Sequence, residues 1–146
     1  MFISEILFRA LKQTEPDESL YHFLENSVRA LDCCDDGLAN FHLVFMLKLS
    51  RYLGFAPNSE GEEDKYFDLL NGVFIHEKPP HVHFIAANVN SDFIRIMQSD
   101  YVDMSAVSIS REDRFKLLEA LVEYYKLHVP EFYGLNSLPV LHALFD

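Results

Sequence analysis

The most constraining feature of the sequence is the segment LANFHLVFMLKLSRYLG, from Leu38 to Gly54, which is apolar on nearly every side. A helix with apolar residues all round is buried, so we expect this one to be the centre of a helical bundle. Its end is predicted from Gly54, which can adopt the left-handed conformation after a helix, and from Pro57, which prevents continuation. The rest of the chain must then supply the elements that surround this helix.

Two amphipathic helices are predicted before the central segment. Apolar residues recur every three or four positions from Phe2 to about Lys12, and again from Leu20 to Leu31. This spacing gives each segment one apolar face. The polar stretch between the two segments contains Pro16 and interrupts the pattern. We expect both helices to cover the central one.

A hairpin and three further helices are predicted after the central segment. Asn71-Gly72 lies between two apolar runs, which is the strongest short signal for a tight β-hairpin. Ser91 is predicted to cap a short helix, Ser110 a longer one that ends at His128, and Ser137 a last short one.

These elements predict a mainly α fold. We expect one compact bundle of five or six helices with one short β-hairpin, in a single domain over residues 1–146.

Charge and cysteine content limit what this domain can do. The 146 residues include 23 Asp and Glu against 12 Lys and Arg, so the net charge is −11. This charge is opposite to that of a dedicated DNA-binding or membrane-binding protein. The only cysteines, Cys33 and Cys34, are adjacent and cannot form a disulfide framework, and no apolar run reaches the roughly 18 residues of a membrane span. We therefore expect a cytoplasmic protein without a membrane contact.

The motifs of common catalytic and cofactor-binding sites are missing. Five glycines are too scattered for a phosphate-binding loop or a dinucleotide fingerprint, so we expect no cofactor and no enzyme of those classes. However, His76, His81 and His83 lie close together in the sequence and could hold a divalent metal. A small helical metal-binding protein or enzyme that uses them therefore remains an alternative. Surface-loop histidines without a ligand are the simpler interpretation.

A candidate binding surface lies near the end of the central helix. Lys48 and Arg51 emerge from an otherwise apolar helix, next to Tyr52 and Phe55. This combination suits an apolar pocket with a cationic rim. Ordinary extension of two long side chains into water at a helix end explains the same pattern without a ligand.

Several segments of the chain carry a resemblance to a known family. FHLVFMLKLSRYLGFAPN, from Phe41 to Asn58, is followed by FDLLNGVF, and later by LLEALVEYYKLHVPEF and LNSLPVLHALF. In this order they resemble the C-terminal helical domain of the RecO family of bacterial recombination mediators, over most of the chain. Many relatives carry a four-cysteine zinc loop after the segment that matches residues 54–58. This chain has no cysteine there, which resembles the form found in Bacteroidetes.

The resemblance implies a non-enzymatic function in DNA repair. RecO proteins act with their partner RecR and help to load recombinase onto single-stranded DNA coated by single-strand-binding protein. In the family an oligonucleotide-binding barrel precedes the helical domain. We therefore expect the chain to be the C-terminal part of a longer protein that binds DNA mainly through that barrel.

The resemblance also implies a peptide ligand. In the family the helical domain is implicated in docking the acidic, phenylalanine-ended tail of single-strand-binding protein. Apolar walls for the ring and cations for the carboxylates are the chemistry that such a tail requires. Lys48, Arg51, Tyr52 and Phe55 are our candidates for part of that site, chosen on their chemistry. A generic helical adaptor with the same fold and another partner is the remaining alternative.

Overall fold

Five α-helices, one 3-10 turn and a three-stranded antiparallel sheet make up the described part of the chain. The structure is a computed structural model that describes residues 2–11, 15, 17–34, 38–61, 64–130 and 132. The elements are α1 (Phe2–Ala10), α2 (Glu18–Asp32), α3 (Leu38–Leu53), β1 (Tyr66–Asp68), β2 (Val73–Ile75), β3 (Phe84–Ile85), α4 (Ala87–Met97), η1 (Met104–Ala106) and α5 (Arg111–His128). The predicted mainly α fold with a short β element is confirmed. The last helix predicted at Ser137 lies outside the described residues.

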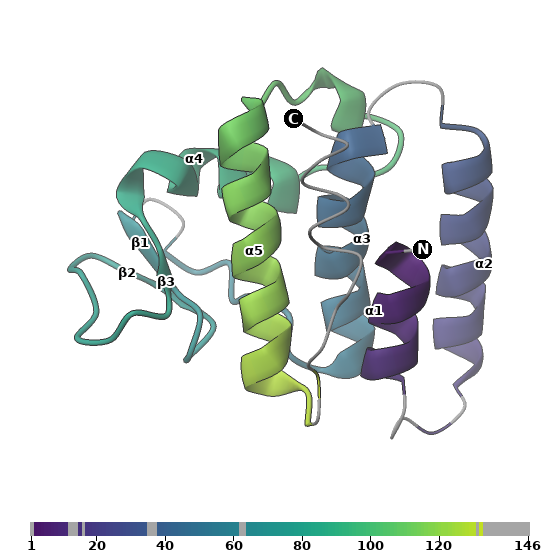
Figure 1. Cartoon of the computed structure of the whole chain (residues 1–146), viewed down its shortest axis with the longest axis horizontal. Coiled ribbons are helices and arrows are strands. Elements are labelled where there is room, and N and C mark those ends of the chain that lie inside the picture. The colour runs from purple at the N-terminus through teal and green to yellow at the C-terminus, as the bar shows by residue number, and fades with distance from the viewer. Residues whose placement is uncertain are drawn as a thin grey trace.

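The central helix of the bundle is α3, as its sequence predicts. It lies between α2 and α5 and packs against both, and also against α4 and η1 (Figure 1). Most of its side chains are buried, among them Phe41, Met46 and Leu49. Burial of each side chain of this size contributes roughly 1.5–3 kcal/mol. Packing on several sides therefore fixes this helix in place.

The end of α3 is a Schellman motif. Gly54 has a φ of +89°. The backbone N–H of Phe55 donates to the carbonyl oxygen of Ser50 over 3.0 Å, and that of Gly54 to Arg51 over 3.3 Å. These two bonds satisfy carbonyl groups that the helix end would otherwise leave unpaired. The predicted stop at Gly54 is confirmed.

The helix α5 packs along α3 and begins and ends where its sequence predicts. The Ser110 hydroxyl caps it by accepting a bond of 3.1 Å from the N–H of Asp113. Within the interface, the hydroxyl of the fully buried Tyr125 donates to the carbonyl oxygen of Met46 over 2.6 Å. This bond links the middle of α3 to the last turn of α5.

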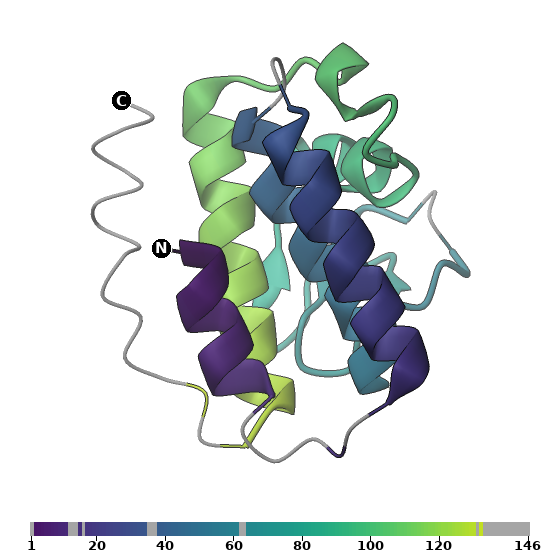
Figure 2. The same cartoon turned by 90° about the vertical axis from the view of Figure 1, so that its right-hand side faces the viewer.

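The helices α1 and α2 lie on the other side of α3, with α2 at the edge of the bundle (Figure 2). Their buried residues follow the predicted stripes, although α1 ends at Ala10. The buried stripe of α2 consists of Leu20, Phe23 and Ser27. The spacing also predicts Val28 on this stripe, which is wrong: Val28 is 55% exposed because it lies on the outer side of an edge helix.

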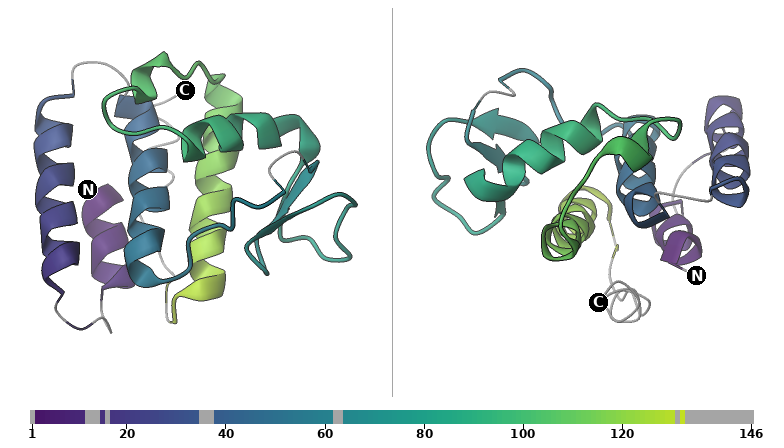
Figure 3. Two further views of the ribbon diagram at one scale, coloured as in Figure 1. Left: turned by 180° about the vertical axis from the view of Figure 1, so that it is seen from behind. Right: turned by 90° about the horizontal axis from the view of Figure 1, so that it is seen from above.

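The predicted hairpin is part of a slightly larger sheet at one end of the molecule (Figure 3). β1 pairs with β2 across the turn at Gly72, and Phe67 lies opposite Phe74. β1 also pairs with β3, which sequence reasoning missed, so the strand order is β2-β1-β3. β3 has only two residues, which is too short for a periodic signal. The sheet packs on α4 through Phe67 and Phe93, whose ring centres are 4.9 Å apart.

The helix α4 begins earlier than its sequence predicts. Ser91 was the expected cap, but the helix starts at Ala87 and Ser91 lies inside it. Val89 and Asn90, which precede Ser91, are buried, and the Asn90 side chain donates to the carbonyl oxygen of Asp64 over 2.9 Å. These tertiary contacts extend the helix beyond its best local cap.

Candidate partner-binding site

Lys48 is held in place by the loop that follows α4. Its ammonium nitrogen lies 3.0 Å from Oδ1 of Asp100 and 5.3 Å from the centre of the Tyr101 ring. The Lys48 side chain is 21% exposed, whereas that of Asp100 is 59% exposed. An ion pair and a cation–π contact therefore fix the ammonium at the surface of α3.

Asp100 remains charged at neutral pH. Burial alone raises the pKa of this carboxyl. The hydrogen bonds from Lys48 and from the backbone N–H of Tyr101, together with the charges of Lys48 and Arg51, outweigh burial and place the pKa below its ordinary value. Lys48 thus faces a carboxylate from its own chain. Sequence reasoning missed this partner because nothing in the local pattern connects positions 48 and 100.

Tyr52 presents a rigid apolar surface next to these charges. Tyr52 is 44% exposed, and its ring stacks on Phe23 of α2 at 4.6 Å, with an interplanar angle of 20°. Similar stacked pairs continue behind it into the core and connect Phe23, Phe45, Phe41 and Tyr101. A ligand ring that lies on Tyr52 would therefore meet a side chain already supported by packing.

Arg51 completes the group of candidate residues on this side of α3. It is exposed, and its charge contributes to the lowered pKa of Asp100. We call Lys48, Arg51 and Tyr52, with Asp100 and Tyr101 beside them, the cationic site. It joins two positive groups to one exposed ring, within little more than one turn of α3.

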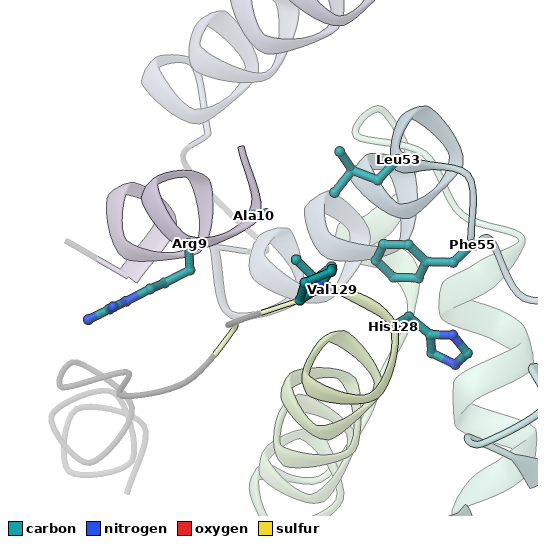
Figure 4. Close-up of a pocket in the computed structure, with 7 residues that line it drawn as sticks. Arg9, Ala10, Leu53, Phe55, His128 and Val129 are labelled. Carbon is teal, nitrogen blue, oxygen red and sulfur yellow. The ribbon is translucent and has the colours of Figure 1, made fainter. Parts of the chain in front are cut away.

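Phe55 lies elsewhere. After the turn at Gly54, its ring packs edge-on against Tyr125 at 5.0 Å and stacks on His128 at 5.6 Å. It lines a pocket of about 240 Å³ between the ends of α1, α3 and α5, together with Arg9, Ala10, Leu53, His128, Val129 and Pro130 (Figure 4). The Phe55 and His128 side chains lie close together in this view, whereas Arg9 points away from them. Of the four predicted site residues, the structure therefore brings together three.

The three histidines of the metal alternative have separate carboxylate neighbours. The pairs are His76 with Asp64 (3.9 Å), His81 with Asp68 (3.0 Å) and His83 with Glu123. The rings of His81 and His83 are 5.8 Å apart. In the part of the chain that the structure describes, no three His, Cys, Asp or Glu side chains are arranged to hold a metal ion. The contact of His83 with Glu123 instead connects the sheet region to α5.

None of the helices within the described ranges is both long and apolar enough to cross a membrane.

Comparison with known proteins identifies the family. Residues 1–139 match the family described as recombination protein O C terminal. The DNA repair protein RecO of Phocaeicola vulgatus is 40% identical over all of this chain and 61% of its own length. The RecO protein of Azobacteroides pseudotrichonymphae is 35% identical over 100% of this chain and 61% of its own length. That of Christiangramia forsetii is 34% identical over 99% of this chain and 60% of its own length.

The chain thus spans about 60% of the length of the curated relatives that it matches. No solved structure gave a significant match. The long match to the family and the identities with these relatives show that the chain belongs to the recombination protein O (RecO) family of DNA repair proteins.

Proposed function

We propose that this chain is a non-enzymatic interaction domain of a recombination mediator. In this function it would act with RecR and help to load recombinase onto single-stranded DNA coated by single-strand-binding protein. Membership of the RecO family supports the setting in DNA repair. With a net charge of −11 the chain is a poor ligand for DNA phosphates, so in this proposal most DNA binding falls to the oligonucleotide-binding barrel that the family resemblance implies.

The contribution of this domain, in the same proposal, is to dock the acidic tail of single-strand-binding protein at the cationic site. The supporting observation is that Lys48, Arg51 and the half-exposed Tyr52 lie together on α3. The carboxylates of the tail would pair with Lys48 and Arg51, and its terminal phenylalanine would lie against Tyr52. Arg51 suits this function because a guanidinium can bind a carboxylate through two parallel hydrogen bonds.

The overall charge makes such binding depend on local contacts. An acidic tail is repelled by a chain of net charge −11 at long range and attracted only near the two cations. Salt weakens both interactions, since the screening length is about 8 Å at physiological ionic strength. We therefore expect the ring of the tail, whose contact salt does not screen, to be essential for affinity.

The proposal is tested by fluorescence anisotropy with a labelled peptide of the tail sequence from the same organism, at low and moderate salt. We expect saturable binding that is lost when the terminal phenylalanine is deleted. Absence of binding at both salt concentrations would contradict docking on this chain and favour the generic adaptor.

A double substitution locates the site. Lys48→Glu with Arg51→Glu should abolish binding and leave the helical circular dichroism signal unchanged, because both side chains lie at the surface of α3. Arg111→Glu with Lys126→Glu is the matched control, since it makes the same change in net charge at exposed positions of α5. Unchanged affinity in the first variant would remove Lys48 and Arg51 from the proposal.

The metal alternative has its own test. Metal analysis of protein purified without chelators would reveal stoichiometric zinc or iron if His76, His81 and His83 formed a centre. The separate carboxylate neighbours of these histidines do not favour that outcome.

A further inference from the structure

The position that a ligand carboxylate would take at Lys48 is already filled. Oδ1 of Asp100 lies 3.0 Å from the Lys48 ammonium, which is the distance of a charge-assisted hydrogen bond. The same oxygen accepts a bond of 2.6 Å from the backbone N–H of Tyr101. An acidic peptide that approaches the cationic site therefore meets one cation that is already paired.

The backbone around Asp100 is fixed, although its side chain reaches water. The backbone N–H of Asp100 donates to Oδ1 of Asp103 over 2.7 Å, and the Tyr101 ring stacks on Phe41 of α3 at 5.1 Å. The Asp100 side chain is nevertheless 59% exposed. Rotation into water would break its contacts with Lys48 and with the Tyr101 N–H, and water would solvate the carboxylate in their place. Because an exposed ion pair contributes only about 0–1 kcal/mol, a competing carboxylate could replace Asp100 at modest cost.

We propose that Asp100 is an internal competitor that occupies the ligand-carboxylate position at Lys48 in the free chain, so that an acidic ligand must displace it. Asp100 is then a determinant of affinity and selectivity at the cationic site. This inference rests on the function proposed above, because it takes the acidic tail as the ligand.

The competition selects for a particular kind of ligand. A ligand with one carboxylate exchanges one ion pair at Lys48 for another and gains little. A ligand that also places a carboxylate at Arg51 and a ring on Tyr52 adds a second ion pair and an aromatic contact, whereas Arg51 acts on Asp100 only through its charge in the interactions described here. The site therefore discriminates against isolated acidic side chains and favours a short acidic segment that carries an aromatic residue.

The opposite role for Asp100 predicts the opposite result. If Asp100 only positioned the Lys48 ammonium for the ligand, its removal would leave Lys48 mobile and weaken binding. If Asp100 competes with the ligand, its removal strengthens binding. The sign of the change in affinity therefore distinguishes the two roles.

The test compares Asp100→Asn with the wild-type chain in anisotropy titrations of the tail peptide. Asn keeps a side-chain oxygen that can accept the bond from the Tyr101 N–H. We expect the dissociation constant to fall about twofold to fivefold, which corresponds to the loss of one exposed ion pair. Glu119→Gln is the control for net charge, because Glu119 is exposed on α5, and its effect should be smaller than that of Asp100→Asn.

A second peptide distinguishes competition at Lys48 from the effect of the change in the net charge of the chain. When the acidic side chains of the tail peptide and its C-terminal carboxyl group are all replaced by amides, the peptide has no carboxylate with which to displace Asp100. The gain from Asp100→Asn should then disappear. A gain that persists with the amide peptide would overturn the inference.

Failure of this inference is distinguishable from failure of the proposed function. If the wild type binds the peptide and Asp100→Asn binds it equally or more weakly, only the inference that Asp100 competes with the ligand is contradicted. If neither chain binds the peptide, the proposed docking function is contradicted, and so is the inference that Asp100 competes with the ligand. Asp100→Ser also removes the charge, so its dissociation constant for the tail peptide should fall as that of Asp100→Asn does. An unchanged or higher dissociation constant for Asp100→Ser would contradict the inference.

Discussion

Asn40 and Arg114 are joined by a hydrogen bond of 3.0 Å, from Nε of the guanidinium to Oδ1 of the amide. Asn40 is 3% exposed, near the start of α3. Its amide nitrogen donates to the carbonyl oxygens of Met104 and Val107, over 2.8 and 2.9 Å. One buried side chain therefore links α3 to η1 and, through Arg114, to α5.

Replacement of Asn40 by leucine should destabilise the fold. It leaves two carbonyl groups and the Arg114 guanidinium without these bonds, and each unsatisfied buried polar group costs about 1–3 kcal/mol. We expect the free energy of unfolding in urea to fall by about 2–4 kcal/mol. Asn26→Leu, at an exposed position of α2, is the control and should change stability little. Equal stability of the two variants would contradict the linking function of Asn40.

Gly54→Ala tests the end of α3. A Cβ at this position would meet nothing within 4 Å among the described residues, so the cost comes from the φ of +89° alone. A left-handed conformation costs a residue with a side chain roughly 1–2 kcal/mol. Thermal or urea unfolding should show a loss of about that size, and Gly54→Asn a smaller loss, because Asn adopts this conformation more readily. A fully neutral Gly54→Ala variant would contradict the expected strain.

His42 should make stability depend on pH. Burial lowers the pKa of its ring to about 4 in the folded chain, against an ordinary value of 6.5. Between these values the unfolded chain binds more protons, so the free energy of unfolding falls as the pH falls through this range, by at most about 3 kcal/mol. The ring packs edge-on against Phe2 at 5.3 Å, so His42→Leu will also change packing.

The relevant comparison for His42 is therefore the slope of stability against pH. Urea unfolding of the wild type and of His42→Leu at several pH values between about 4 and 7 measures it. His22→Leu, at an exposed position of α2, serves as the control. Parallel slopes for the wild type and His42→Leu would exclude His42 as the source of the dependence.

Tyr52→Ser should weaken binding of the tail peptide. It removes the exposed ring on which we place the terminal phenylalanine, and a loss of one aromatic contact with its buried area raises the dissociation constant roughly tenfold. Tyr21 is 70% exposed on α2, outside the cationic site, so Tyr21→Ser should leave the affinity unchanged. Similar losses in both variants would indicate a nonspecific contact of the peptide with exposed rings.

The helices of this fold could be predicted from sequence because their signals are local. Periodicity located the buried faces of α1, α2 and α5, and the caps at Ser110 and Gly54 are made by neighbouring residues. β3 and the start of α4 were missed because both depend on contacts that are distant in sequence. β3 pairs with β1, and Asn90 binds the carbonyl group of Asp64.

The candidate site could be predicted only in part for the same reason. Helical spacing places Lys48, Arg51 and Tyr52 on neighbouring turns, which the sequence shows directly. The turn at Gly54 then carries Phe55 to the α5 side, and the partner of Lys48 comes from position 100. Neither relationship has a signal in the residues nearby.

The most direct test of the docking site is a ¹⁵N–¹H correlation spectrum of the labelled chain, recorded during titration with the tail peptide. The account predicts saturable shifts concentrated at Lys48, Arg51, Tyr52, Asp100 and Tyr101, which all lie at the cationic site. Saturable shifts around Phe55 and His128, with none at Arg51 and Tyr52, would contradict it.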